Sequence, residues 1–373
     1  MKRILFVVNV DWFFISHRLP IAISLIESGV QVHLACGFTT HKIYLEGLGI
    51  ITYPLVISRS GMSLVQEIGA FRSIYKAVKS INPDLAHLIS IKPVMYGSLI
   101  TRLLRVRKVV ASISGLGFIF IDQSLKAKVI RKIAICCYRL GLSAKNVTVI
   151  FQNTADRSLF IDKKIISVSQ AILIRGSGVD LNYFRFSPEP EGVPVVMFLA
   201  RFLKDKGIVE FVEASSIVKA SFPSVRFVLV GSVDSDNPNS ITPIDLNSWV
   251  KRGLVEDWGY STNVFSTIQK SNLMVLPSYR EGLPKSLLEA AACGRAVITS
   301  DTPGCRDAIV DSETGLLVNL RDTQMLAATI LQLLQNGPLR KQYGAAGRRL
   351  AEKHFDVQNV VSRHFSIYFD EKN

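Results

Sequence analysis

Short apolar segments alternate with helical patterns along most of the 373 residues, and this alternation limits the possible folds more than any other feature. It is typical of parallel α/β units, in which buried strands are connected through helices. The first set of apolar segments comprises residues 3–8, 31–36, 84–90, 108–114 and 147–152, and the second comprises residues 194–200, 225–231, 273–278 and 295–301. The pattern therefore predicts two sheets of parallel strands.

A segment rich in proline separates the two sets. Residues 185–194, RFSPEPEGVP, contain three prolines and one glycine, and we interpret them as a linker. A chain of this length is also expected to form two domains of roughly 150–200 residues each. We therefore expect a Rossmann-like domain over residues 1–185 and a second one over residues 186–356. A ligand site is expected between them, at the carboxyl ends of the strands.

The excess positive charge lies entirely in the first half of the chain. Residues 1–190 contain 24 Lys and Arg against 10 Asp and Glu, a net charge of +14, whereas residues 191–373 contain 20 of each. Such a field attracts the phosphates of nucleic acid or anionic lipid. The bases are scattered over α/β units without a recognised nucleic-acid motif, so we expect no nucleic-acid partner.

Within this basic half, residues 126–145 combine basic and apolar side chains in a helical pattern. A basic amphipathic helix suits a membrane surface. An ordinary helix with its apolar stripe in the core and its bases in solvent fits equally well. The sequence leaves both alternatives open.

The sequence favours a reducing, cytoplasmic compartment. No apolar run reaches the ~18 residues of a membrane-spanning helix. Asn9 and Asp11 interrupt the first apolar run, and no small-residue cleavage site follows, so we interpret this run as a strand and not as a signal peptide. The five cysteines, with Cys136–Cys137 adjacent, form neither a disulfide framework nor a zinc motif. We expect no metal and no cofactor.

The clearest chemical pattern lies in LPSYREGLPKSLLEAAACG, residues 276–294. A strand ends, a loop carries Glu281, and Pro284 suits the first turn of a helix because proline has no N–H to leave unpaired. The backbone N–H groups at a helix start form a ready anion site. Glu289 lies about one further turn along the helix, so the two carboxylates can contact different parts of one long ligand.

Two cations follow the first strand of the second set. Arg201 can bind a diphosphate with two hydrogen bonds, and Lys206 can add a point charge. Together with a helix start, they could stabilise a nucleoside-diphosphate leaving group without a metal. Either pattern alone is common on protein surfaces, but here both occur at strand ends of one domain.

RFLKDKG (201–207) and EGLPKSLLEAAACGRAVITSDTPGCRDAI (281–309) together resemble the retaining nucleotide-sugar glycosyltransferases of family 4. These enzymes have the GT-B fold, in which two Rossmann-like domains face each other across a cleft. The E-x7-E pattern of the family falls on Glu281 and Glu289, and the resemblance extends over most of the chain. It also implies that the helical segment within residues 357–373 crosses back to the first domain.

The resemblance implies a role for each matching residue. Glu281 would face the donor sugar near the reacting centre, while Arg201 and Lys206 would neutralise the diphosphate. Glu289 would hold the ribose hydroxyls, and Tyr260 would border the base. The predicted donor-binding residues are Glu289, Gly282, Leu283, Pro284, Lys285 and Tyr260. The reaction would retain the anomeric configuration through a same-face attack, in which the leaving phosphate helps take the acceptor's proton.

Within the family, residues 12–20, 83–97 and 114–120 most resemble transferases of bacterial O-antigen or capsule synthesis. This implies a UDP-sugar donor carrying an N-acetylated hexosamine or a deoxyhexosamine, and a polyprenyl-diphosphate-linked acceptor. The enzyme would associate peripherally with the inner face of the cytoplasmic membrane, and its basic first domain fits an acceptor that is both anionic and apolar. The acceptor candidates are His17, Arg18, His87 and Lys92. Of Trp12, Phe13 and Phe14, we expect at least two in the core.

Some features depart from the family. The first loop lacks the glycine pair of many members, and Ser114 replaces a histidine that lies near the donor sugar in relatives. The literal DxD at residues 234–236 is a metal motif of a different glycosyltransferase fold, so we expect no metal there. Two alternatives remain: a nucleotide-sugar 2-epimerase of similar fold, which the basic first domain and the E-x7-E pattern disfavour, and a glycosyltransferase with a soluble acceptor.

Overall fold

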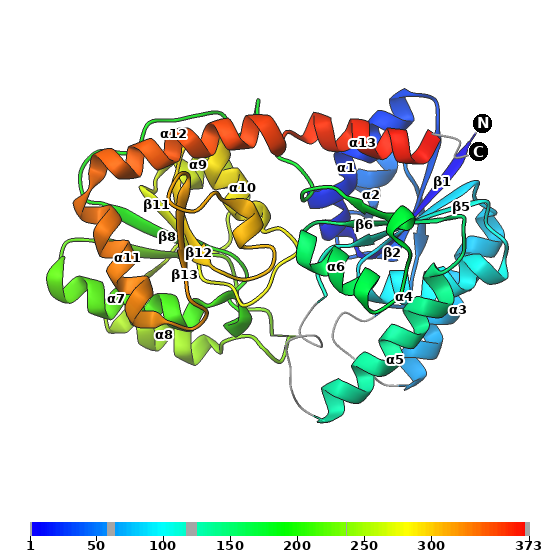
Figure 1. Cartoon of the computed structure of the whole chain (residues 1–373), viewed down its shortest axis with the longest axis horizontal. Helices are drawn as coiled ribbons and strands as arrows, with labels where there is room; N and C mark the ends of the chain where they lie inside the picture. Colours follow the sequence, from blue (N-terminus) through cyan, green and yellow to red (C-terminus); the bar gives the residue numbers. More distant parts are fainter. Residues whose placement is uncertain (1, 58–63, 117–124, 236, 370–373) are drawn as a thin grey trace. The chain divides into compact units, whose positions relative to one another are not determined.

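The computed structural model describes residues 2–57, 64–116, 125–235 and 237–369. The chain forms two compact units, drawn in Figure 1. Unit 1 contains residues 1–177 and 358–373, and unit 2 contains residues 178–357.

Unit 1 is built on a parallel sheet of seven strands in the order β3-β2-β1-β4-β5-β6-β7. Its strands are β1 (Arg3–Val10), β2 (Gln31–Gly37), β3 (Ile51–Pro54), β4 (Leu85–Ile89), β5 (Lys108–Ile113), β6 (Val147–Phe151) and β7 (Ala171–Leu173). Its helices are α1 (Asp11–Glu27), α2 (Lys42–Gly47), α3 (Leu64–Ile81), α4 (Ile91–Leu103), α5 (Leu125–Leu142), α6 (Thr154–Asp162) and α13 (Val357–Phe369). Every residue of β4 and β6 is buried. Helices cover both faces, with α3, α4 and α5 on one side of the sheet and α1 and α13 on the other (Figure 1).

Unit 2 is built on a parallel sheet of six strands in the order β10-β9-β8-β11-β12-β13. Its strands are β8 (Val195–Leu199), β9 (Arg226–Val230), β10 (Glu256–Asp257), β11 (Leu273–Leu276), β12 (Ala296–Ser300) and β13 (Gly315–Val318). Its helices are α7 (Ile208–Ser221), α8 (Pro243–Lys251), α9 (Val264–Gln269), α10 (Lys285–Ala292), α11 (Thr323–Gln335) and α12 (Gly337–His354). The apolar faces of these elements form one continuous core.

Each predicted strand segment contains a strand of the structure, whereas β3, β7, β10 and β13 were not predicted. These four strands are the edges of the two sheets and are two to four residues long. An edge strand has one neighbour and is partly exposed, so it does not need the long apolar run by which the inner strands were found.

The boundary between the units lies after Ser177, and not after Arg185 as the sequence predicted. Val179 forms a parallel bridge with the chain that follows α12. The guanidinium of Arg348, on α12, donates a hydrogen bond of 2.8 Å to the Phe184 carbonyl. These contacts attach residues 178–184 to unit 2.

Residues 185–194 belong to unit 2 and are not a free linker. The buried Arg295 donates hydrogen bonds to the carbonyl (2.7 Å) and the hydroxyl (2.9 Å) of Ser187. Arg340 forms a buried ion pair of 2.8 Å with Glu189. Two arginines of unit 2 therefore fix this proline-rich segment to that unit.

Helix α13 packs on the sheet of unit 1, as the family resemblance implied. The Tyr368 hydroxyl lies 2.6 Å from Nδ1 of His87 on β4, and the other ring nitrogen of His87 lies 2.7 Å from the Ser112 hydroxyl. The chain thus returns to its first domain, where Tyr368 is buried with these partners.

Candidate active site

In unit 2, the loops that follow the carboxyl ends of β8, β11 and β12 pack closely against one another. Gly207 has a φ of +76°, and a Cβ there would lie 2.2 Å from the Pro277 carbonyl oxygen at the end of β11. Gly304 has a φ of +83°, and its Cβ would lie 2.3 Å from the Glu281 carbonyl oxygen. Only glycine allows both approaches, because it lacks a Cβ and adopts positive φ without strain. The two glycines therefore fix the loop that carries Glu281.

This arrangement brings Lys206 and Glu281 together, as both had been predicted to lie at strand ends of one domain. The Lys206 ammonium lies 2.5 Å from Oε1 of Glu281, and the Ser278 hydroxyl lies 2.8 Å from the same oxygen. Their side chains are 18% and 13% exposed, so solvent screens the pair less than a surface ion pair. An ammonium has three donors, and Lys206 can therefore retain Glu281 while it donates to a phosphate.

Arg201 is held by a partner that the sequence reasoning did not assign to it. Its guanidinium forms an ion pair of 2.8 Å with Asp234, the first residue of the DxD sequence. Asp236 lies outside the described residues. Within the described part of the chain, no cluster of three or more His, Cys, Asp or Glu residues could hold a metal ion. Arg201 is 41% exposed, and such pairs contribute little stability, so its side chain can exchange Asp234 for a ligand.

Helix α10 begins at Lys285, and Pro284 is its N-cap and not its first helical residue as predicted. The Leu283 side chain is buried in the core of unit 2, so only its backbone is available to a ligand. Gly294 follows the helix with a φ of +78°, as expected for a C-terminal glycine.

Glu289 is buried on α10, with 7% of its surface exposed, and its Oε1 lies 3.6 Å from the Lys285 ammonium. Burial raises the pKa of Glu289 to about 7, and Lys285 opposes this rise. Near neutral pH the carboxyl is thus close to half protonation and can both donate and accept hydrogen bonds. A hydroxyl group can donate to a carboxylate oxygen, so the ribose contact that the sequence predicts for Glu289 needs only the acceptor capacity.

Tyr260, the predicted base contact, lies in the loop after β10 and is 75% exposed.

The site also includes a residue, Tyr279, that the sequence did not indicate. Tyr279, in the same loop as Glu281, donates a hydrogen bond of 2.5 Å to Glu210 on α7, and the Arg321 guanidinium lies over its ring. The sequence gives no periodic signal for such a contact between a loop and a helix.

In unit 1, β1 ends at Val10 and α1 begins at Asp11, so the loop that the sequence predicted here is absent. Asp11 was not among the predicted site residues. Its carboxylate accepts hydrogen bonds from the backbone N–H groups of Thr39 (2.7 Å) and His41 (3.2 Å). Burial would raise the pKa of Asp11, but the hydrogen bonds from Thr39 and its neighbours outweigh this and lower it. A buried carboxylate therefore ties the start of α1 to the loop after β2.

The aromatic residues of this region differ in their burial. Phe14 is fully buried, whereas Trp12 and Phe13 are only partly buried, so the expectation that at least two would be core was wrong. The His17 ring stacks on Phe13 with a centroid distance of 4.1 Å. His17 is thus partly buried against an aromatic surface.

Lys92, on α4, lies in an ion pair. Its ammonium is 2.7 Å from Glu67 on α3, and the Tyr96 hydroxyl donates to the other oxygen of Glu67 at 2.6 Å. An acceptor would have to compete with this partly buried pair.

Arg18 and His87 were predicted to contact the acceptor. Both are buried, so this prediction was wrong. Arg18 is 1% exposed, and its guanidinium donates to the His17 carbonyl (2.8 Å) and the Ser177 hydroxyl (3.1 Å). His87 is 0% exposed, and burial, together with His364 and Arg18, lowers its pKa well below the ordinary value. Both side chains hold unit 1 together and present no surface to a ligand. The loop predicted at residues 114–120 lies outside the described residues from residue 117 onward.

Two family models match the chain, "Glycosyl transferase 4-like" over residues 3–153 and "Glycosyl transferases group 1" over residues 180–350. The chain belongs to the family 4 glycosyltransferases. One relative is the N,N'-diacetylbacillosaminyl-diphospho-undecaprenol alpha-1,3-N-acetylgalactosaminyltransferase of Campylobacter jejuni, 28% identical over 364 residues that cover 94% of each chain. Another is the putative glycosyltransferase EpsD of Bacillus subtilis, 24% identical over 99% of this chain and 97% of that protein.

Solved structures show the fold of this glycosyltransferase. Anabaena Alr3699/HepE in complex with UDP and glucose is similar with a TM-score of 0.78 and 17% identity, over 98% of this chain and 99% of that one. WaaG, a glycosyltransferase involved in lipopolysaccharide biosynthesis, has a TM-score of 0.77 and 13% identity, over 98% and 99% of the chains. The predicted GT-B fold is therefore confirmed.

Proposed function

We propose that this glycosyltransferase moves a sugar from a UDP-sugar to a polyprenyl-diphosphate-linked saccharide, with retention of configuration, in the synthesis of a surface polysaccharide. The sugar would be an N-acetylated hexosamine or a deoxyhexosamine. The observation that carries the proposal is the Lys206–Glu281 pair. Gly207 and Gly304, from two neighbouring loops, fix the position of the loop that carries Glu281. The UDP and glucose in the Anabaena structure support the donor class, and the name of the Campylobacter relative supports the acceptor class.

The positive groups of the site would act on the leaving group. As the bond between sugar and UDP breaks, negative charge grows on the diphosphate. Lys206 would donate to this charge while it keeps Glu281 in place, and Arg201 would exchange Asp234 for a phosphate oxygen. The N–H groups at the start of α10 would add the positive end of the helix dipole. Donors fixed in advance stabilise developing charge without reorganisation during the reaction.

Glu281 would act on the sugar itself. The sugar ring gains positive character as the leaving group departs, and a carboxylate close to it favours that state. Lys206 and Ser278 both hold Oε1 of Glu281, so the orientation of the carboxylate is set before the substrate binds. The acceptor's proton would pass to the leaving phosphate on the same face of the sugar.

The substrate assignment is tested with purified enzyme, a panel of UDP-sugars and polyprenyl-diphosphate-sugar acceptors, with products identified by mass spectrometry. We expect transfer to a lipid-linked acceptor from at least one N-acetylated or deoxy donor. Turnover of a soluble acceptor with no transfer to any lipid-linked one would reject the acceptor. Conversion of a UDP-sugar to its 2-epimer without an acceptor would establish the epimerase instead.

The site assignment is tested with two lysines of the same short helix. Lys206→Ala should lower kcat by about 10²–10³, the usual loss for one transition-state donor. Lys204 is exposed in the same helical turn (Lys204–Lys206), so Lys204→Ala is the matched control and should leave kcat near normal. Glu281→Gln, which preserves the shape of the side chain, should be impaired like Lys206→Ala. Near-normal turnover in either site variant would overturn the assignment.

The proposed acceptor is embedded in a membrane, and α5 offers a surface for that environment. Val129, Ile133 and Leu140 of α5 are 58%, 58% and 57% exposed, and Cys136 is exposed between them. Their spacing places all four on one helix face. A second apolar set of α5, comprising Ala134, Tyr138 and Leu142, is buried in unit 1. The helix thus has both a core stripe and an exposed apolar stripe.

Exposed bases accompany this stripe on α5, namely Lys128, Lys132 and Arg139. We propose that α5 rests on the anionic inner surface of the cytoplasmic membrane, with its apolar stripe at the acyl boundary. Among the described residues, no helix is both long and apolar enough to cross a bilayer.

This placement is tested by flotation with vesicles that contain phosphatidylglycerol. Ile133→Ser with Leu140→Ser should lose most vesicle binding. The control variant Ile43→Ser removes a more exposed apolar side chain, 84% exposed on α2, and should bind as the wild type does. Equal binding of all three proteins would reject α5 as the membrane contact.

A further inference from the structure

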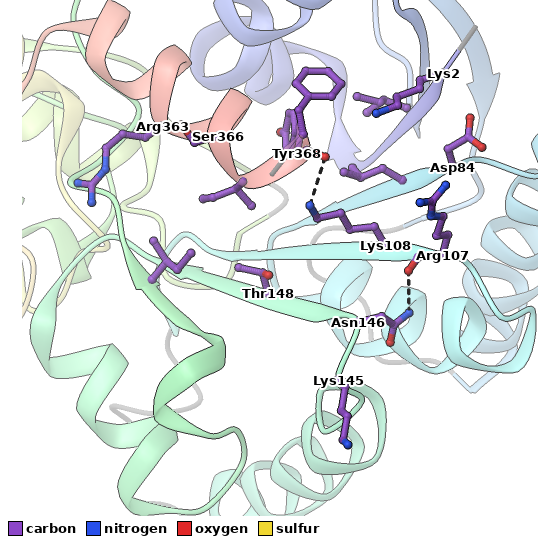
Figure 2. Close-up of a pocket in the computed structure, with 15 residues that line it drawn as sticks. Lys2, Asp84, Arg107, Lys108, Lys145, Asn146, Thr148, Arg363, Ser366 and Tyr368 are labelled. Carbon is purple, nitrogen blue, oxygen red and sulfur yellow. Dashed lines mark hydrogen bonds between the residues drawn. The ribbon is translucent and has the colours of Figure 1, made fainter. Parts of the chain in front are cut away.

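A pocket of about 600 Å³ opens at the amino-terminal edge of the sheet in unit 1 (Figure 2). It is lined by residues at the starts of β1, β4, β5 and β6 and by the last turns of α13. The predicted acceptor residues His17 and Lys92 instead follow the carboxyl ends of β1 and β4. In a parallel sheet these are opposite edges, so the pocket is separate from the site expected for the acceptor.

The lining of this pocket is strongly basic. Among the described residues that line it, the cations are Lys2, Arg107, Lys108, Lys145 and Arg363, and the carboxylate is Asp84. Five positive charges and one negative charge give a net charge of +4 around a single cavity. Lys145 and Arg363 are exposed, and neither forms an ion pair within the part of the chain that the structure describes. A concave surface lined by one sign of charge concentrates counter-ions of the opposite sign.

Hydrogen bonds hold the walls of the pocket in place (Figure 2). The Lys108 ammonium donates to the Tyr368 carbonyl at 3.3 Å, which joins the start of β5 to α13. The Asn146 amide donates to the carbonyls of Val106 (2.8 Å) and Arg107 (3.5 Å), which joins the start of β6 to the start of β5. The shape of the cavity is therefore set by the fold before any ligand binds.

The lining of the pocket also contains apolar side chains. Ile4, Leu85 and Ile172 contribute to it from three different strands, and Phe369 contributes from α13. The Lys2 ammonium lies 5.0 Å from the centre of the Phe369 ring. A ligand for this pocket would carry negative charge and could also bury a small apolar part.

We propose that this pocket is a second ligand site, which binds a phosphate-bearing organic molecule and is distinct from the donor site in unit 2. Its volume lies within the range of roughly 300–1,000 Å³ of small-molecule sites. Two phosphate groups would balance the net charge of +4, because each has close to two negative charges at neutral pH. A soluble phosphate monoester can supply this charge, and the headgroup of an anionic phospholipid also carries a phosphate, as a phosphodiester with a single negative charge.

The site is tested by calorimetric titration of the full-length protein with inorganic pyrophosphate, with UDP in excess to occupy the donor site. Lys145→Glu with Arg363→Glu should weaken pyrophosphate binding roughly tenfold or more, because charge-assisted contacts are replaced by repulsion. The control is Lys76→Glu with Lys163→Glu, which makes the same charge change at exposed positions of unit 1 outside the pocket. This control should bind as tightly as the wild type.

Three outcomes would overturn the proposal: no pyrophosphate binding by the wild type, equal binding by the pocket variant, or equal weakening in both double variants. Circular dichroism shows whether the pocket variant is folded, and Lys145→Gln with Arg363→Gln should give an intermediate affinity. Flotation with phosphatidylglycerol vesicles then distinguishes the two sources of phosphate. Loss of vesicle binding in the pocket variant alone identifies a lipid headgroup, whereas unchanged vesicle binding identifies a soluble ester.

Discussion

Glu289→Gln offers the sharpest test of the electrostatics of the candidate site. The pKa of this buried carboxyl is about 7 in the folded protein, against an ordinary value of 4.5. Each pKa unit corresponds to about 1.4 kcal/mol, so full ionisation of Glu289 costs the folded state about 3 kcal/mol. Glutamine has nearly the same shape and never ionises, so the variant avoids this cost.

The sign of the effect follows from the direction of the shift. A carboxyl whose pKa is raised by folding contributes its full stability below pH 4.5 and loses it as the pH rises through 7. Between pH 6 and pH 8, the wild type should therefore lose about 1 kcal/mol of its free energy of unfolding through this residue. The stability of Glu289→Gln relative to the wild type should rise by that amount over the same interval.

Urea unfolding at the two pH values measures this difference. The chain has three tryptophans, of which Trp249 and Trp258 lie in unit 2 with Glu289. In a Trp12→Phe background, fluorescence therefore reports on unit 2 alone. Glu313→Gln removes an exposed carboxyl of the same unit and controls for the loss of one negative charge. If the relative stability of Glu289→Gln were the same at pH 6 and pH 8, the raised pKa of Glu289 would be refuted.

Two further predictions concern single contacts. Gly304→Ala places a methyl group 2.3 Å from a carbonyl oxygen and should lower both the melting temperature and kcat, whereas Gly253→Ala, at a similar positive φ in open space, should cost only the roughly 1 kcal/mol of backbone strain. Tyr368→Phe leaves the buried Nδ1 of His87 without its partner and should lower the free energy of unfolding by about 1–3 kcal/mol, measured by urea unfolding. The exposed Tyr183→Phe is its control, and an equal loss in both variants would show that the buried contact contributes nothing.

The inner strands of both sheets could be predicted because each satisfies a local condition. A strand buried on both faces must be apolar along its whole length, and β4 and β6 are buried at every residue. The start and end of α10 were readable to within a residue, since Pro284 directly precedes the first helical residue and Gly294 follows the last turn with a positive φ. The edge strands were missed because their position in the sheet relaxes that condition.

The sequence predicted which residues form the candidate donor site, but it did not predict which of them contact one another. Lys206 and Glu281 each follow an apolar strand, and this placed them at the same edge of one sheet. Their separation of 2.5 Å depends on β8 and β11 being neighbours and on Gly304 from a third loop. The pairing of Arg201 with Asp234 likewise joins two loops that no local pattern connects.

The acceptor prediction failed for two residues because local sequence patterns do not indicate tertiary burial. Arg18 next to His17 at the start of a helix suggested an exposed anion site, and His87 at the end of a strand suggested the same. Both are buried, because Tyr368 and its neighbours on α13 return to this part of unit 1 from the far end of the sequence. No local pattern near Arg18 could indicate a cover that lies about 350 residues away along the chain.

The sequence by itself determined the family, the two parallel sheets and the chemical types of residue at the strand ends, because these depend on periodicity and on motifs within short segments. Only the tertiary structure decided which charged side chains meet, which are buried and which remain exposed. It gave α5 a second, exposed apolar face, and it gathered bases from four separate parts of the chain around one pocket. Burial and charge pairing depend on the whole chain, because each is set by neighbours that are distant in sequence.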